Sequence, residues 1–223
     1  KVKSDSDISK VEIPVIIYSG PESNLPIIFE RINSRGTQLN KYQIYAATWS
    51  RDHVEINNTE IIDFIKAKYD SLIEEGLQIN NYDPNSTDFY KSDFNVFEYV
   101  FGLGKYLSEH YPGLFGKNNS EDSTESIGFN LCTMCLKGSL KEMPELPSGF
   151  NQIDLDKFFD ALIDSIDLVH ACLKPFILLK ANKKNSRNHN NTIYHTEYQI
   201  VSFIAKIYKS KYIHKHTDIH FFL

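Results

Sequence analysis

Apolar residues recur with the 3.6-residue period of an α-helix over most of the chain after residue 40. The clearest stretch lies between Asp154 and Leu173, and Pro175 is expected to end it. One face of this stretch carries an apolar stripe formed by Leu155, Phe158, Phe159, Leu162, Ile166, Val169 and Leu173. Because such a stripe must be buried against other helices, the sequence predicts a mainly α fold with a helical bundle.

Further segments show the same spacing and carry capping or stop signals. We expect these helices to cover residues 40–49, 60–75, 94–110, 127–136 and 198–208, after a short helix near 24–36. Asn57 and Glu60 are expected to cap the helix at 60–75, and Gly76 to stop it. Pro144 and Pro147 predict a loop. The apolar faces predict burial of four residues, Trp49, Phe158, Phe159 and Leu162.

Residues Val11 to Tyr18 have the β-branched, apolar composition of a strand, and Pro14 favours an edge position. We expect strand content to be confined largely to the first 20 residues. A lone strand needs partners, which we expect upstream of Lys1. The first residues carry no starting Met and no signal-peptide pattern, so we expect Lys1 to be a cut inside a longer protein.

Charge and cysteine usage narrow the class of protein. The formal net charge is −5, yet residues 174–223 carry nine Lys and Arg against two Asp and Glu. Such a basic stretch is either a nucleic-acid-binding patch or a solvated face. No apolar run approaches the roughly 20 residues that span a bilayer, so we expect a soluble protein with no membrane partner. Three cysteines without secretory features favour reduced thiols and the cytoplasm.

The densest motif runs from Ile13 to Trp49, as a strand, a helix, a glycine turn and a second helix with Tyr42, Tyr45, Ala46 and Trp49 on one face. This block resembles the second conserved block of the GmrSD-type restriction-system family, domain of unknown function family 262. The matching residues are Phe29, Glu30, Arg31, Ile32, Asn33, Gly36, Thr37, Leu39, Ala47 and Trp49.

The resemblance implies that residues 1–52 are the C-terminal edge of a ParB/sulfiredoxin-like nucleotide-binding domain and that residues 53–223 form a helical domain. For the intact protein it implies an NTPase, an endonuclease or both, acting in restriction of modified or phage DNA. The cofactor stays open, with a nucleoside triphosphate and magnesium as one candidate for the intact protein. The resemblance implies DNA as partner, and family members often carry a His-Asn-His-type nuclease module.

Two family features are not found in this sequence. The Asp-Gly-Gln-Gln-Arg motif is absent, and in the family it precedes the matching block, so we expect it upstream of Lys1. His189 and His195 lie in a polar stretch without the strand-turn-helix context of a nuclease site. We therefore expect the chain to be inactive by itself.

The turn between the two motif helices has the chemistry of an anion site. A helix ending near Asn33, a reversal at Gly36 and a new helix from Asn40 would collect unpaired amides. Arg31, Arg35 and Lys41 would add positive charge. The candidate residues for nucleotide or DNA phosphate are Arg31, Asn33, Arg35, Gly36, Thr37 and Lys41. The alternative is that Asn33 and Gly36 only cap a helix and that the arginines are solvated.

Other constellations have a plainer interpretation than a metal site. Cys132 and Cys135 share a helical face and could begin a zinc site, but buried apolar thiols are favoured. The aspartates at 154, 156, 160, 164 and 167 could hold magnesium, but a solvated helix face is favoured. The spacing of His214, His216 and His220 fits neither a strand face nor a helix face, so no metal is expected there.

Two functional hypotheses follow. In the first, the intact protein is a nucleotide-dependent DNA restriction or phage-defence factor whose motif turn contacts phosphate. In the second, the chain is a non-catalytic helical domain that docks a partner protein or the nuclease module.

Overall fold

The computed structural model describes residues 17–21, 24, 28, 41–77, 79, 82–84, 89, 93–115, 121–181 and 196–214. Within these ranges the fold is mainly α, as predicted, with one two-stranded sheet. The α-helices are α2 (Lys41–Thr48), α3 (Thr59–Glu74), α4 (Val96–His110), α5 (Pro112–Phe115), α6 (Glu121–Leu136), α7 (Leu146–Phe150), α8 (Leu155–Ala181) and α9 (Glu197–Tyr208). A 3-10 helix, η5 (Leu140–Glu145), precedes α7, and a π turn, η6 (Lys209–Ile213), follows α9.

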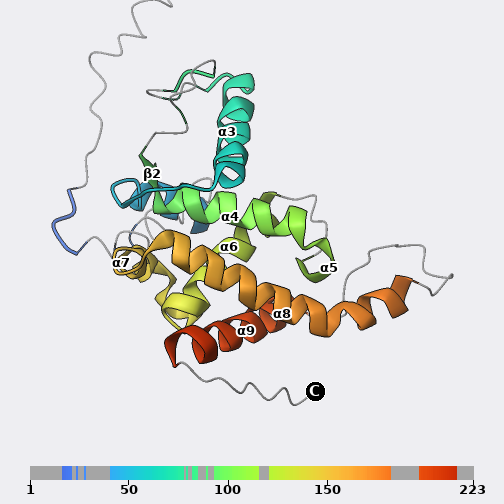
Figure 1. Ribbon diagram of the computed structural model, residues 1–223. Helices are drawn as coiled ribbons and strands as arrows, with labels where there is room; N and C mark the ends of the chain where they lie inside the picture. The colour runs from blue at the N-terminus through green and yellow to red at the C-terminus, as the bar shows by residue number, and fades with distance from the viewer. Residues whose placement is uncertain are drawn as a thin grey trace, which may run out of the picture.

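Helix α6 lies in the middle of the bundle and packs against α4 on one side and α9 on the other. Helix α3 packs on α4 and rises steeply from it, while α8 crosses the front of the molecule over α9 (Figure 1). One apolar core runs through all these helices. Among the four residues expected to be buried, Trp49, Phe158 and Leu162 are buried, and Phe159 is half-buried at the edge of the core.

Two short strands join the start of α3 to the start of α4. In β1 (His53–Val54) and β2 (Phe94–Asn95), His53 pairs with Asn95 and Val54 with Phe94 in antiparallel register. The prediction that strand content would be confined largely to the first 20 residues is not contradicted, since the described residues after Arg51 hold only this two-stranded sheet and residues 11–16 lie outside the described residues. A two-residue strand is too short to show an alternating pattern. Of the predicted strand at 11–18, only Ile17 and Tyr18 are described, and neither is extended into a strand.

Helix α3 begins one residue away from the predicted cap. The Asn58 side chain accepts the Ile61 N–H, whereas the Asn57 side chain reaches a distant helix instead. The predicted stop at Gly76 is confirmed, since this residue has φ 88° and its N–H donates to the Ile73 carbonyl.

Three other boundaries differ from the expectations. Phe94 lies in β2 and not in the helix, because an Asn95–Glu98 capping box starts α4 at Val96. The 3-10 helix η5 and helix α7 replace the loop predicted from Pro144 and Pro147. Pro147 is tolerated because it lies in the first turn of α7, whereas Pro144 lies inside η5. Helix α6 starts at Glu121, earlier than expected.

Pro175 does not end α8, which continues to Ala181. Proline removes one backbone hydrogen bond and crowds the preceding turn, but a long helix can absorb this change as a kink. Pro175 is exposed, so the carbonyl that loses its partner lies near solvent. On α9, Val201, Ile204 and Tyr208 are buried as expected from their shared face, whereas Tyr198 is 57% exposed.

Candidate functional site

The predicted phosphate-binding turn is described only at its last residue. Arg31, Asn33, Arg35, Gly36 and Thr37 lie outside the described residues. Lys41 is the first residue of α2, so the helix predicted to follow the turn is present. The proposed phosphate contacts of the six residues remain predictions.

Lys41 is on the surface, but its ammonium group is partly withdrawn from water. Its Nζ atom lies 4.8 Å from the centre of the Tyr42 ring. Partial burial lowers the pKa of Lys41, and the nearby carboxylate of Glu197 opposes that shift. The lysine therefore lies in the field of a carboxylate from the other end of the chain, at the start of α9.

Glu197 joins α9 to α6 through both of its carboxylate oxygens. Ser126 Oγ donates to one oxygen and Asn130 Nδ2 to the other, each at 2.8 Å. Asn130 is only 1% exposed, and this pairing satisfies the polar end of its side chain. The start of α2 thus lies near a polar junction between α6 and α9.

An aromatic cluster fixes α2 to α6. The rings of Tyr45 and Trp49 stack with centroids 4.6 Å apart, and Trp49 stacks on Phe129 of α6 at 5.6 Å. Tyr42 meets the same phenylalanine at 4.9 Å. Phe129 is fully buried, so these contacts exclude water as well as aligning the rings. The first residue after the predicted turn is therefore held on a rigid element.

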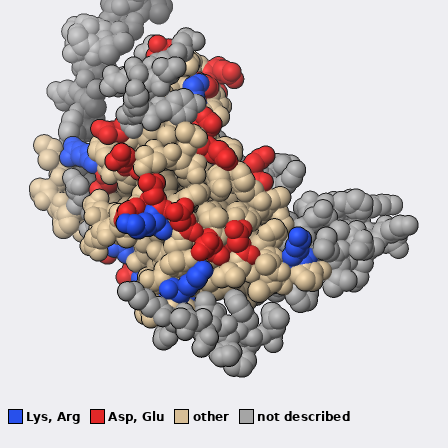
Figure 2. All heavy atoms as spheres, viewed as in Figure 1, with Lys and Arg blue, Asp and Glu red and all other residues tan. Residues whose placement is uncertain are grey.

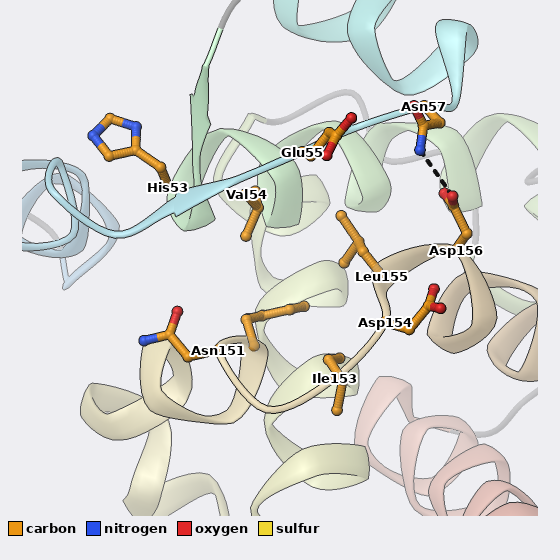
Figure 3. A pocket seen from close by; sticks show the side chains of 10 residues that line it. His53, Val54, Glu55, Asn57, Asn151, Ile153, Asp154, Leu155 and Asp156 are labelled. Atoms are coloured by element: carbon orange, nitrogen blue, oxygen red, sulfur yellow. Dashed lines mark hydrogen bonds between the residues drawn. The ribbon is translucent and has the colours of Figure 1, made fainter.

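A second candidate site, the acidic pocket, was not foreseen from the sequence. It lies between the extended segment 53–57 and the connection from α7 to α8, residues 150–156, and has a volume of about 340 Å³ (Figure 3). The described lining residues are His53, Val54, Glu55, Asn57, Phe150, Asn151, Ile153, Asp154, Leu155 and Asp156. The sequence favoured a solvated helix face for Asp154 and Asp156, with a magnesium site as the alternative.

The carboxylates of the acidic pocket have different surroundings. Asn57 Nδ2 donates to Asp156 Oδ2 at 2.8 Å and links the two walls. Asp154 pairs with Lys157 at 2.8 Å, and hydrogen bonds from Lys157 hold the pKa of Asp154 below its usual value. Figure 2 shows acidic side chains gathered in a band over α8, the helix that begins at the pocket.

The aspartates farther along α8 bind other elements of the fold. Asp164 accepts hydrogen bonds from Tyr212 at 2.5 Å and Lys211 at 3.3 Å. Asp167 accepts one from Tyr111 at 2.9 Å. These carboxylates remain exposed to solvent, as the predicted solvated face requires, but they also hold η6 and the end of α4 against α8.

The cysteine pair is buried, as predicted. Cys132 and Cys135 are both 0% exposed on α6, and burial raises the pKa of each thiol. In the part of the chain that the structure describes, no group of three or more His, Cys, Asp or Glu side chains could hold a metal ion. Of the three C-terminal histidines, His214 is described and exposed, and His216 and His220 lie outside the described residues.

Comparisons with protein-family models, curated proteins and solved structures find no match to this chain. Among the described helices, none combines the length and the apolar character needed to cross a membrane.

Proposed function

We propose that this chain is part of a nucleotide-dependent DNA restriction or phage-defence protein. In this proposal the turn formed by residues 31–41 contacts the phosphate of a nucleotide or of the DNA backbone. Residues 1–52 would complete a ParB/sulfiredoxin-like domain and residues 53–223 would form the helical domain. The reaction would take place in the cytoplasm, in an intact protein that also supplies the NTPase or endonuclease groups.

The main support for the proposal is the N-terminus of α2, which packing holds in place. A helix N-terminus bears a partial positive charge and unpaired N–H groups, which suit a phosphate. The contact of Tyr42 with Phe129 holds this helix end in place, so a phosphate bound there would not have to order it. Lys41 adds a full charge at the same end.

Each residue of the predicted turn has a distinct role in the proposed phosphate binding. Arg31 and Arg35 can each donate two parallel hydrogen bonds to phosphate oxygens, which a lysine cannot do. Gly36 allows the backbone to reverse and Thr37 adds a hydroxyl donor. Because Glu197 attracts Lys41, we expect the arginines to contribute more binding free energy than Lys41.

The test uses the intact protein with Arg31→Ala, Arg35→Ala and Lys41→Ala variants. We expect either arginine variant to weaken binding of Mg-ATP, Mg-GTP or duplex DNA by about 1 to 3 kcal/mol, the scale of a charge-assisted hydrogen bond. Melting temperatures should remain nearly unchanged. Lys141→Ala is the matched control, because Lys141 is an exposed cation on η5, outside the turn.

The opposite pattern favours the second hypothesis. If an arginine substitution unfolds the protein and spares nucleotide and DNA binding, the turn is a scaffold for helix packing. The chain would then act as a helical domain that docks a partner protein.

A further inference from the structure

The C-terminal half of α8 carries an apolar stripe that is exposed to solvent. This exposed stripe consists of Leu168, Ala171, Cys172 and Pro175, all of them exposed, with Leu168 at 39%. Their spacing places them on one side of the helix, apart from the buried stripe that ends at Leu173. Within the described residues, α8 therefore presents a second apolar face that its own bundle does not bury.

The pattern of the exposed stripe is that of a helix that pairs with another helix. Positions 168, 171 and 175 follow the alternating three- and four-residue spacing of a helix-pairing seam. In the sequence this spacing continues at position 178, which is Leu. The last turns of α8 extend past the end of α9 (Figure 1). A partner helix can therefore lie along this part of α8 without displacing α9.

The charges of α8 are divided between its two halves. Residues 155–167 carry four Asp and one Lys, whereas residues 168–181 carry Lys174 and Lys180 and no Asp or Glu. In Figure 2 the acidic side chains gather over the first part of α8 and do not extend to its last turns. Two copies of α8 laid antiparallel would place the acidic half of each against the basic half of the other, whereas a parallel pair would oppose like charges. The helix is thus complementary to itself in one direction only.

We propose that the exposed stripe binds the same stripe of a second copy of this chain, with the two α8 helices antiparallel. A two-fold contact brings the same surface of both copies together, so one interface covers both stripes. The self-complementary charge pattern favours a second copy over an unrelated partner, which would not require it. Because the contact is short, the dimer is weak and depends on protein concentration. The inference does not depend on the proposed phosphate-binding turn.

The test is analytical ultracentrifugation of the intact protein in low salt. Concentrations up to about 100 μM populate a dimer with a Kd in the micromolar range, and we expect this dimer to dissociate on dilution. Leu168→Glu places a carboxylate in the exposed stripe, and we expect it to raise the dimer Kd about tenfold or more. Leu77→Glu is the matched control, because Leu77 is 54% exposed and lies after the end of α3, outside α8. It should leave the dimer Kd nearly unchanged.

The direction of pairing is tested by removing one charge. In an antiparallel pair, Lys174 lies in the field of the aspartates of the other copy, so Lys174→Gln should raise the dimer Kd about threefold in low salt. In a parallel pair the two Lys174 side chains would repel each other, and the same variant would tighten the dimer. The effect should vanish near 1 M salt, where the screening length is about 3 Å. Lys141→Gln, an exposed cation on η5, is the control.

Three results would overturn the proposal. They are a monomer at every concentration, a dimer whose Kd is the same in Leu168→Glu as in wild type, and a dimer that Lys174→Gln tightens. Thermal melts establish that each variant is folded. If Leu168→Glu lowers the melting temperature, Ala171→Glu replaces it, because Ala171 is a second exposed position of the stripe. We expect the same rise in the dimer Kd for Ala171→Glu, and an unchanged Kd in this variant would overturn the proposal.

Discussion

Helices α6 and α8 differ in how much of their surface is buried. Helix α6 is enclosed by α4 and α9, and its residues Ile127, Phe129, Leu131, Cys132 and Cys135 are all 0% exposed. Helix α8 buries a single stripe and keeps its aspartates in water. An enclosed helix therefore has little freedom in side-chain volume, whereas a surface helix is constrained on one face only.

The polar groups of the two helices differ in the same way. On α6, the Thr133 hydroxyl donates a hydrogen bond to the Phe129 carbonyl at 2.6 Å, and the Asn130 side chain donates one to Glu197. On α8, Asp164 and Asp167 bind tyrosines at the surface. Loss of a partner should cost more on α6, where water cannot replace it.

The largest expected effect is the loss of the ring at the centre of the aromatic cluster. Phe129→Ala leaves a cavity among Tyr42, Tyr45, Trp49 and Phe97, so we expect a loss of about 3 to 5 kcal/mol in the free energy of unfolding. Phe159→Ala on α8 removes a half-buried ring and should cost clearly less. Urea unfolding of both variants measures the difference, and equal losses would contradict the contrast between the helices.

The second-largest expected effect on stability comes from the close approach of the α4 and α6 backbones at Gly128. A Cβ atom at Gly128 of α6 would lie 2.1 Å from the Val100 carbonyl oxygen of α4, so the two backbones could not keep their distance. We expect Gly128→Ala to destabilise the fold by about 3 kcal/mol, despite the better helix propensity of alanine. Asp160→Ala on the exposed face of α8 serves as the control and should change stability by no more than about 0.5 kcal/mol. A thermal melt that leaves Gly128→Ala near wild type would show that α4 and α6 can separate freely.

A matched cysteine pair gives a smaller effect. Cys132→Ser places a hydroxyl at a fully buried position on α6, which should cost about 1 to 3 kcal/mol. The same change at the exposed Cys172 of α8 should stay within about 0.5 kcal/mol. Chemical denaturation measures the loss in the free energy of unfolding for Cys132→Ser and for Cys172→Ser. Similar losses would mean that the surroundings of Cys132 on α6 are more hydrated than its burial indicates.

The smallest effect is a dependence on pH at α8. Hydrogen bonds from Tyr212 and Lys211 lower the pKa of Asp164, so its stabilising contribution is present above the ordinary carboxyl pKa and is lost as pH falls through the lowered value. Since Asp164 is exposed, that contribution should be at most about 1 kcal/mol. The stability difference between wild type and Asp164→Asn should therefore shrink as the pH falls below about 4. A constant difference across that range would exclude the carboxylate charge as its source.

The same contrast explains which helices were easy to predict. The stripe of α8 is one-sided, so its periodicity stands out, and only its end beyond Pro175 was missed. Helix α6 is apolar in its buried half and polar at its start, so the sequence indicated only 127–136 of the 121–136 that form it. For the predicted turn, only Lys41 can be compared with the structure, and the domain boundary at residue 52 stays a prediction.

Local patterns in the sequence determined the helical class, the buried face of α8, the stop at Gly76 and the buried thiols of α6, because each depends on neighbours within a few residues. Only the tertiary structure decided that Asn58 and not Asn57 caps α3, that β1 pairs with β2, and that an acidic pocket exists. Asn57 lies 99 residues from Asp156 in the chain, and their hydrogen bond forms one end of that pocket. Local spacing cannot predict such a contact, because only the tertiary fold brings the segment before α3 and the start of α8 together.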